Sequence, residues 1–205
     1  MKILVLGSGA REHAIVKALI RTGTNPTNIT CAPGNGGISE EVQTVALDIN
    51  DPDAVTAWAS EAQTDLVVIG PEAPLVAGVS DALRAKDIAV FGPSKAAAQL
   101  EGSKDFAKGV MRDAGVPTAR SFTCQSQIEI EKALDTFGAP YVVKDDGLAA
   151  GKGVVVTDDR QVALEHAISC KRVVIEEFLN GPEVSLFGIS DGRNVLPMEP
   201  AQDFK

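Results

Sequence analysis

Apolar residues in the first half of the chain fall into short continuous runs, and between these runs they recur at helical spacing. A short apolar run that ends at a turn residue is typical of a strand buried on both faces. Asp51 followed by Pro52 is a typical helix start. These patterns predict strands over residues 3–6, 29–32, 42–46, 65–70 and 88–91, and helices over 11–21, 51–62 and 75–85. Strands that alternate with helices indicate a parallel sheet with right-handed crossovers.

The pattern changes near residue 101, where we place a domain boundary. Ser103 is a good helix N-cap, and Gly115 follows as a helix stop. Asp191-Gly192 predicts a hairpin turn between the last two strands. The second half is therefore expected to be α+β, with helices over 103–114, 126–137 and 158–168 and strands over 121–123, 141–144, 154–157, 173–177, 184–190 and 194–198.

Composition narrows the class of ligand. The 205 residues carry a net charge of −9 and are 44% apolar, so the chain has a folded core and lacks the broad basic surface of a nucleic-acid-binding protein. Its three cysteines, an odd number without paired spacing, indicate reduced thiols in a cytoplasmic protein. No apolar run approaches the ~20 residues of a membrane helix. We expect small-molecule ligands, no nucleic acid and no membrane.

The first glycine-rich segment, Gly7-Ser8-Gly9-Ala10-Arg11-Glu12, follows a predicted strand and opens a predicted helix. Glycines let the backbone approach an anion, and a helix N-terminus supplies free N–H donors. Glu12 stands where a dinucleotide fingerprint has its third glycine, and Arg11 adds a charged fork suited to phosphate. We favour a phosphate or phosphosugar site; the alternative is a tight turn that binds nothing.

Two further turns follow predicted strands. The segment 32–37, with Asn35, is equally compatible with an anion-binding turn and a plain loop. The segment 70–75 follows the most apolar strand, and such loops line ligand crevices in parallel sheets. Glu72 there could accept sugar hydroxyls; alternatively, Pro71 and Pro74 only shape the turn and Glu72 favours a helix start.

The glycine-rich segment 147–154 lies between two predicted strands. Only three residues separate Gly147 from the Gly151-Lys152 pair, and Gly153 replaces the Ser or Thr, so this is not a Walker loop. It suits a lid over phosphates, especially with Lys144 just upstream; the alternative is a hairpin tip. The segment 176–183 could meet an adenine edge and a ribose, but from the residues alone a solvated strand end is favoured.

Taken in order, these segments resemble the phosphoribosylamine–glycine ligase (glycinamide ribonucleotide synthetase) family of ATP-grasp enzymes. The strings that carry the resemblance are 7–14, 32–35, 70–75, 91–93, 99–104, 146–154 and 175–179, and the resemblance spans essentially all 205 residues. It implies that glycine attacks ATP to form glycyl phosphate. The amine of 5-phosphoribosylamine then displaces phosphate, giving glycinamide ribonucleotide and ADP in purine biosynthesis.

The resemblance also implies roles for individual residues. Catalytic roles fall to Lys144, Lys152 and Asp203. ATP would be bound by Lys104, Lys144, Gly147, Gly151, Lys152, Gly153, Glu176, Phe178, Leu179 and Glu183. Phosphoribosylamine and other substrate contacts would come from Gly9, Arg11, Asn35, Pro71, Glu72 and Lys205.

The implied architecture is an α/β fold in four parts. A Rossmann-like phosphoribosylamine-binding domain would span 1–101, a linking helix of the ATP-grasp central domain 102–120, the lid subdomain 121–190, and the start of the central domain 191–205. The family has Ala where this chain has Asp145, a carboxylate that either weakens phosphate attraction or points away.

The family continues beyond the part matched here. Its Mg²⁺ (or Mn²⁺) ligands lie in that later part, so we assign no metal ligand to this chain and expect it to be incomplete, and weak or inactive alone. A monomer is expected. The alternatives are a non-catalytic nucleotide- or phosphosugar-binding module, a carboxylase-type ATP-grasp enzyme and, least favoured, an oxidoreductase.

Overall fold

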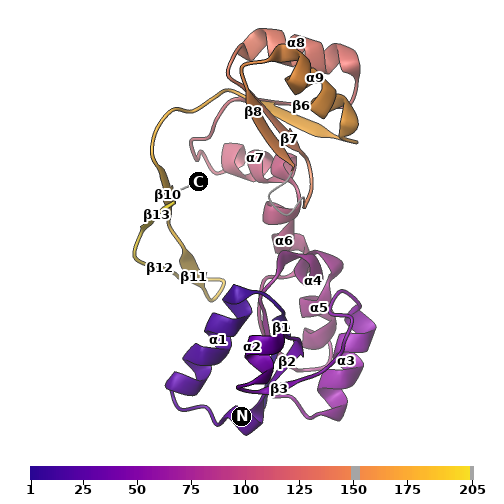
Figure 1. Ribbon diagram of the computed structural model, residues 1–205, viewed down its shortest axis with the longest axis vertical. Coiled ribbons are helices and arrows are strands. Elements are labelled where there is room, and N and C mark those ends of the chain that lie inside the picture. Colours follow the sequence, from indigo (N-terminus) through magenta and orange to yellow (C-terminus); the bar gives the residue numbers. More distant parts are fainter. Residues whose placement is uncertain (149–152, 204–205) are drawn as a thin grey trace.

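The first domain is a five-stranded parallel sheet, as the alternating pattern predicts (Figure 1). The computed structural model describes residues 1–148 and 153–203. Residue 203 is described by its backbone alone. The strand order is β3-β2-β1-β4-β5, which puts β1 at the centre. The strands are β1 (Ile3–Gly7), β2 (Ile29–Pro33), β3 (Gln43–Thr44), β4 (Leu66–Ile69) and β5 (Ala89–Phe91).

Helices cover both faces of this sheet, which explains its continuous apolar strands. Leu4 and Leu6 of β1 pack into one buried cluster with Val55 and Leu83, and Ile3 and Val5 pack into another with Val16 and Ile38. The covering elements are α1 (Ala10–Arg21), a 3₁₀ turn (Pro26–Asn28), α2 (Gly36–Ser39), α3 (Pro52–Glu61), α4 (Glu72–Ala77) and α5 (Val79–Arg84). Asp51 caps α3 through hydrogen bonds from the amides of Asp53 and Ala54, which confirms the predicted cap.

Two predicted elements of the first half need correction, and one helix was not predicted. The single helix expected over 75–85 is two helices, because Gly78 adopts a left-handed conformation with φ of 104° that ends α4. The strand expected over 42–46 pairs only at Gln43–Thr44. An additional helix, α6 (Lys95–Gly102), is capped by Ser94 and leads directly into the second domain.

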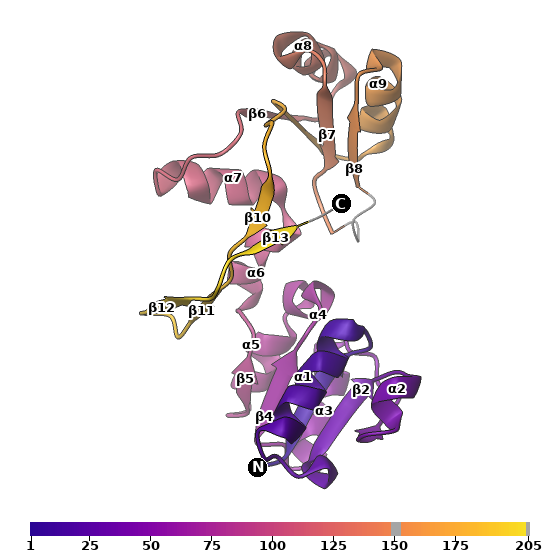
Figure 2. The same cartoon turned by 60° about the vertical axis from the view of Figure 1, so that its left-hand side comes forward.

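The second domain is a four-stranded antiparallel sheet with helices on one face (Figure 2). The helix α7 (Lys104–Asp113), capped by Ser103 as predicted, precedes it. The strand order is β6 (Ser121–Cys124), β9 (Val173–Glu176), β7 (Tyr141–Asp145) and β8 (Val154–Thr157). The helices α8 (Gln127–Phe137) and α9 (Arg160–Ser169) pack on it around buried Leu134, Val143 and Ile175.

The register of this sheet places Lys144 and Glu176 on the same face. Val142 pairs with Glu176, and Val143 pairs with Ile175. Alternate residues of a strand point to opposite faces, so Lys144 and Glu176 share the face opposite α8 and α9, as diagonal neighbours.

The last described segment is an arm that extends from the second domain (Figures 1 and 2). The strand β10 (Glu183–Ser185) pairs with β13 (Ala201–Asp203), and β11 (Gly188–Ser190) pairs with β12 (Val195–Pro197). The predicted turn at Asp191-Gly192 is confirmed, but the strand expected over 184–190 is divided in two. Among the described residues, no helix is both long enough and apolar enough to span a bilayer.

Candidate functional site

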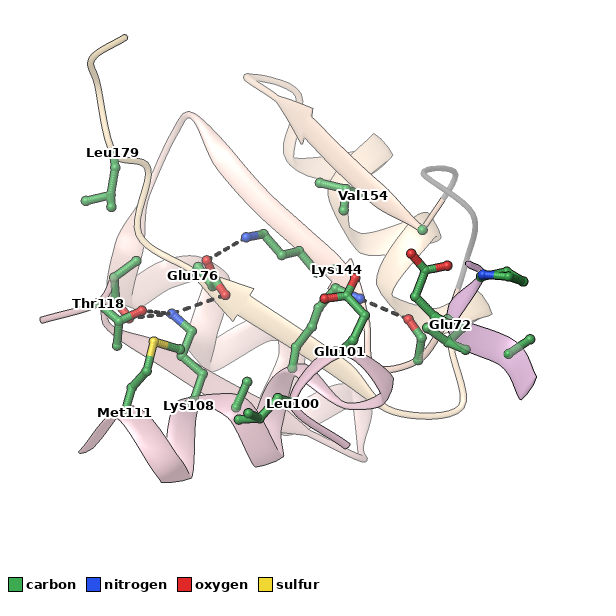
Figure 3. Close-up of a pocket in the computed structure, with 18 of the residues that line it drawn as sticks. Glu72, Leu100, Glu101, Lys108, Met111, Thr118, Lys144, Val154, Glu176 and Leu179 are labelled. Atoms are coloured by element: carbon green, nitrogen blue, oxygen red, sulfur yellow. Dashed lines mark hydrogen bonds and ion pairs between the residues drawn. The ribbon is translucent and has the colours of Figure 1, made fainter. Parts of the chain in front are cut away.

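A cleft of about 1160 Å³ lies between the two domains, and both contribute to its walls (Figure 3). The first domain contributes Arg11 and the turn after β4. The helices α6 and α7 form one wall, and the strands β7, β8 and β9 form another. The residues that line it are Arg11, Pro71, Glu72, Ala73, Leu100, Glu101, Lys104, Ala107, Lys108, Met111, Pro117, Thr118, Ala119, Lys144, Gly147, Leu148, Gly153, Val154, Glu176 and Leu179.

Arg11 and Glu72 meet because β1 and β4 are adjacent parallel strands. Segments that follow such strands lie side by side at one edge of the sheet. The Arg11 Nη1 atom is 3.0 Å from Glu72 Oε1. This hydrogen bond lowers the pKa of the Glu72 carboxyl and, together with the negative charge of Glu72, raises the pKa of Arg11. Both side chains are partly exposed, and Figure 3 shows Glu72 at one end of the cleft.

Gly9 and Asn35, predicted to bind substrate, do not line this cleft. The Gly9 amide donates to Glu12 Oε2 at 2.6 Å. Asn35 donates from Nδ2 to the Ser8 carbonyl at 2.8 Å, and its Oδ1 accepts from the Ile38 amide. The Asn35–Ser8 hydrogen bond joins the loops after β1 and β2.

The central charged group of the cleft is Glu176, the last residue of β9. Its Oε2 atom is 2.8 Å from Lys144 Nζ, and its Oε1 atom is 3.2 Å from Lys108 Nζ. The Glu176 side chain is only 7% exposed, and burial of an ionised carboxylate requires such paired cations. Figure 3 shows both ammonium groups directed at its two oxygens.

Lys104, from the first turn of α7, holds the start of the glycine-rich segment. Its Nζ atom donates to the carbonyls of Asp145 at 2.7 Å and Gly147 at 3.0 Å. The carboxylate of Asp146 reinforces this attachment, since it accepts hydrogen bonds from the Ser103 hydroxyl and the Asp105 amide. Among the described residues, these contacts use two N–H donors of the Lys104 ammonium and leave one.

The remaining predicted ATP-binding, substrate-binding and catalytic residues divide into three groups. Gly147, Gly153 and Leu179 line the cleft. Phe178 is exposed and does not line it, and Glu183 lies further along the chain, in β10. Gly151, Lys152, Lys205 and the side chain of Asp203 lie outside the described residues.

Asp145, which departs from the family pattern, is not among the residues that line the cleft. It lines a separate depression of about 510 Å³ with His166 and Cys170. Burial raises the pKa of the Cys170 thiol, and the nearby charge of Asp145 raises it further. The extra carboxylate is therefore on the side away from the cationic cleft.

Four further residues line the cleft that the sequence patterns do not single out: Lys108, Glu101, Met111 and Thr118. Lys108 had a detectable signal, because it lies four residues after Lys104 and a helix presents such residues on one side. The cleft lining carries four cationic and three acidic side chains, in a chain whose net charge is −9. This local excess of cations fits an anionic ligand. Among the described residues, no group of three or more His, Cys, Asp or Glu side chains could hold a metal ion.

Comparisons with known proteins cover the whole chain. Residues 1–101 match the N domain of phosphoribosylglycinamide synthetase, and residues 102–205 match its ATP-grasp (A) domain. The chain is 62% identical over 205 residues to phosphoribosylamine–glycine ligase of Streptomyces coelicolor, which covers 100% of this chain and 49% of the relative. With the Leifsonia xyli ligase it shares 60% identity over 211 residues, again 100% of this chain and 50% of the relative.

Solved structures give the same picture. The crystal structure of phosphoribosylamine–glycine ligase from Thermotoga maritima matches with a TM-score of 0.79 and 31% identity, over 98% of this chain and 49% of that chain. The chain spans about half the length of the curated relatives it matches.

Proposed function

Because the chain belongs to the phosphoribosylglycinamide synthetase family, we propose that it is part of an ATP-dependent ligase that joins glycine to 5-phosphoribosylamine. The products would be glycinamide ribonucleotide, ADP and phosphate. In this proposal, the cleft binds ATP against the second domain and 5-phosphoribosylamine against the first, so that the two ligands meet between the domains.

The observation that carries the proposal is the content of that one cleft. Arg11 and Glu72 enter it from the first domain, and Lys104 and Lys144 enter it from the second. A phosphosugar needs a cation for its phosphate and acceptors for its hydroxyls, which Arg11 and Glu72 supply. A nucleoside triphosphate needs several cations around its phosphates.

The nucleotide would be held as follows. Lys144, whose one partner among the described residues is Glu176, retains two N–H donors for phosphate oxygens. Among the described residues, Lys104 retains one N–H donor. It also holds the Asp145 and Gly147 carbonyls, next to the segment 147–153 that is proposed to cover the phosphates. Glu176, Phe178 and Leu179 are proposed to surround the adenine, and Glu183 to accept a ribose hydroxyl.

The chemistry proposed is attack of the glycine carboxylate on the γ-phosphoryl group, which forms glycyl phosphate and ADP. The phosphoribosylamine nitrogen then attacks the acyl carbon, and phosphate leaves. Positioning and neutralisation of phosphate charge are the main demands of the first step. Exclusion of water protects the acyl phosphate before the second. Lys152 and Asp203 are proposed to take part, as the family resemblance implies.

Magnesium, a cytoplasmic location and a monomeric state are further proposals drawn from the same family resemblance. Phosphoryl transfer from ATP commonly uses Mg²⁺ to neutralise charge on the β- and γ-phosphates. We assign no ligand set for this ion, and no catalytic step through it, to the described residues.

ADP release tests the proposal. The chain is incubated with Mg-ATP, glycine and freshly generated 5-phosphoribosylamine, each omitted in turn, with and without the remaining half of the Streptomyces coelicolor relative. We expect release that requires both glycine and phosphoribosylamine, and that is strongest when the remaining half is present. ADP release that continues when glycine or phosphoribosylamine is omitted contradicts the proposed ligase activity. A chain that binds ADP but forms no ADP from ATP under any of these conditions supports a binding module instead.

A further inference from the structure

The proposed function leaves one buried cation of the cleft without a role. Lys108 lies one helical turn after Lys104 in α7, and its side chain is only 16% exposed. Its Nζ atom lies 3.2 Å from Glu176 Oε1 and donates to Thr118 Oγ1 at 2.9 Å and to the Ala119 carbonyl at 2.7 Å.

These three partners use all three N–H donors of the Lys108 ammonium. The ammonium therefore cannot bind a phosphate oxygen without giving up a contact inside the protein. Lys144 is different, because its side chain is 28% exposed and Glu176 is its single partner among the described residues. Of the two lysines, Lys144 is the one that can be shared with a ligand.

Glu176 connects the two lysines through separate oxygens, one to each (Figure 3). A buried carboxylate with only one cation nearby holds that cation strongly, since separating them leaves an uncompensated buried charge. With Lys108 present, Glu176 keeps one partner even while Lys144 turns toward a phosphate. Without Lys108, phosphate would compete with Glu176 for Lys144.

We propose that Lys108 is a positioning residue for nucleotide binding. It orients and neutralises Glu176, so that Lys144 stays available to the phosphates of a nucleoside di- or triphosphate. Lys108 acts through Glu176 and does not contact the nucleotide. The inference rests on the proposed function, because it requires that the cleft bind a nucleotide.

Titration calorimetry of the 205-residue chain with ADP and with adenosine tests this role. We expect Lys108→Met to weaken ADP binding by about tenfold, as loss of one member of a charge network does. Adenosine, which has no phosphates, is expected to bind Lys108→Met as it binds the wild type. Lys86→Met removes an exposed lysine outside the cleft and is the matched control, expected to leave both affinities unchanged.

The decisive variant is the double substitution Lys108→Met/Glu176→Gln. A neutral amide in place of the Glu176 carboxylate cannot capture Lys144 by charge, so the double variant is expected to bind ADP at least about threefold more tightly than Lys108→Met. Lys108→Gln keeps amide donors for the Thr118 and Ala119 oxygens. Lys108→Gln also removes the charge at position 108, and it replaces Lys108→Met in the test if Lys108→Met does not fold.

The outcomes separate the inference from the proposed function. A folded neutral variant that binds ADP like the wild type overturns the role of Lys108 alone. A double variant as weak as Lys108→Met also overturns it, because Lys108 then acts without Glu176. A folded wild-type chain that does not bind ADP overturns the proposed function and the inference together.

Discussion

The Glu12 carboxylate lies directly against the Cα atom of Gly70, in space that a β-carbon would occupy. A β-carbon on Gly7 would meet the same side chain. Glu12 is 3% exposed and is held by the Gly9 amide. Glu12, at the position of the third glycine of a dinucleotide fingerprint, therefore packs between the turns after β1 and β4. The absence of a β-carbon at Gly7 and Gly70 leaves space for its side chain.

Substitution of Gly70 tests this packing. Gly70→Ala should lower the free energy of unfolding by about 1–3 kcal/mol, because an inserted methyl forces a buried side chain and backbone to move. Denaturant unfolding followed by circular dichroism measures the loss. Gly36→Ala is the control, since no atom lies within 4 Å of the β-carbon position there, and it should be neutral or slightly stabilising. Equal stability of the two variants contradicts the packing argument.

The Arg11–Glu72 pair gives a pH dependence with a defined sign. Because the pKa of Glu72 is lowered in the folded protein, the pair stabilises the fold above pH 4.5, the ordinary glutamate value. That contribution is lost as the pH falls through the lowered pKa. An exposed pair contributes about 0.2–1 kcal/mol. A double-mutant cycle with Arg11→Met and Glu72→Gln should find this coupling at neutral pH and none well below the lowered pKa. A coupling that persists in acid contradicts it.

The cysteines should differ in reactivity. Burial, with the nearby charge of Glu12, raises the pKa of the Cys31 thiol to about 11, so the thiolate that reacts is scarce at neutral pH. Cys170 is only partly buried. We expect a thiol reagent at mildly alkaline pH to label Cys170 before Cys31, and to label all three cysteines in denaturant. Mass spectrometry of tryptic peptides measures the order, and early labelling of Cys31 in the folded chain contradicts it.

Local patterns identified most of the fold. The continuous apolar strands, the Asp51 cap and the Asp191-Gly192 turn are all present, because each depends on neighbours in the sequence. The break at Gly78 also has a local signal, since a glycine inside a helical pattern lowers the expectation of one continuous helix. Gly78 takes a φ of 104°, which residues with a β-carbon rarely adopt, and the apolar spacing of 75–85 does not reveal this.

The site was predicted less completely than the fold, because part of it depends on tertiary contacts. Arg11, Glu72, Lys104, Lys144 and Glu176 were all identified, and the structure brings them into one cleft. The contact between Lys108 and Glu176 arises only because α7 packs against the end of β9, a crossing that no local spacing encodes. Gly9 and Asn35 belong to recognisable motifs outside the cleft lining, and their substrate-binding role stays a prediction.

The measurement that tests the account most directly is calorimetric titration of the chain with a non-hydrolysable ATP analogue, for the wild type and Lys144→Met. The account predicts one binding site in the wild type and a loss of affinity of about tenfold or more in the variant, since a charge-assisted phosphate contact is removed. Thermal unfolding confirms that both chains are folded. A folded wild-type chain that does not bind the analogue, or a variant that binds it equally well, would contradict the assignment of the cleft as an ATP site.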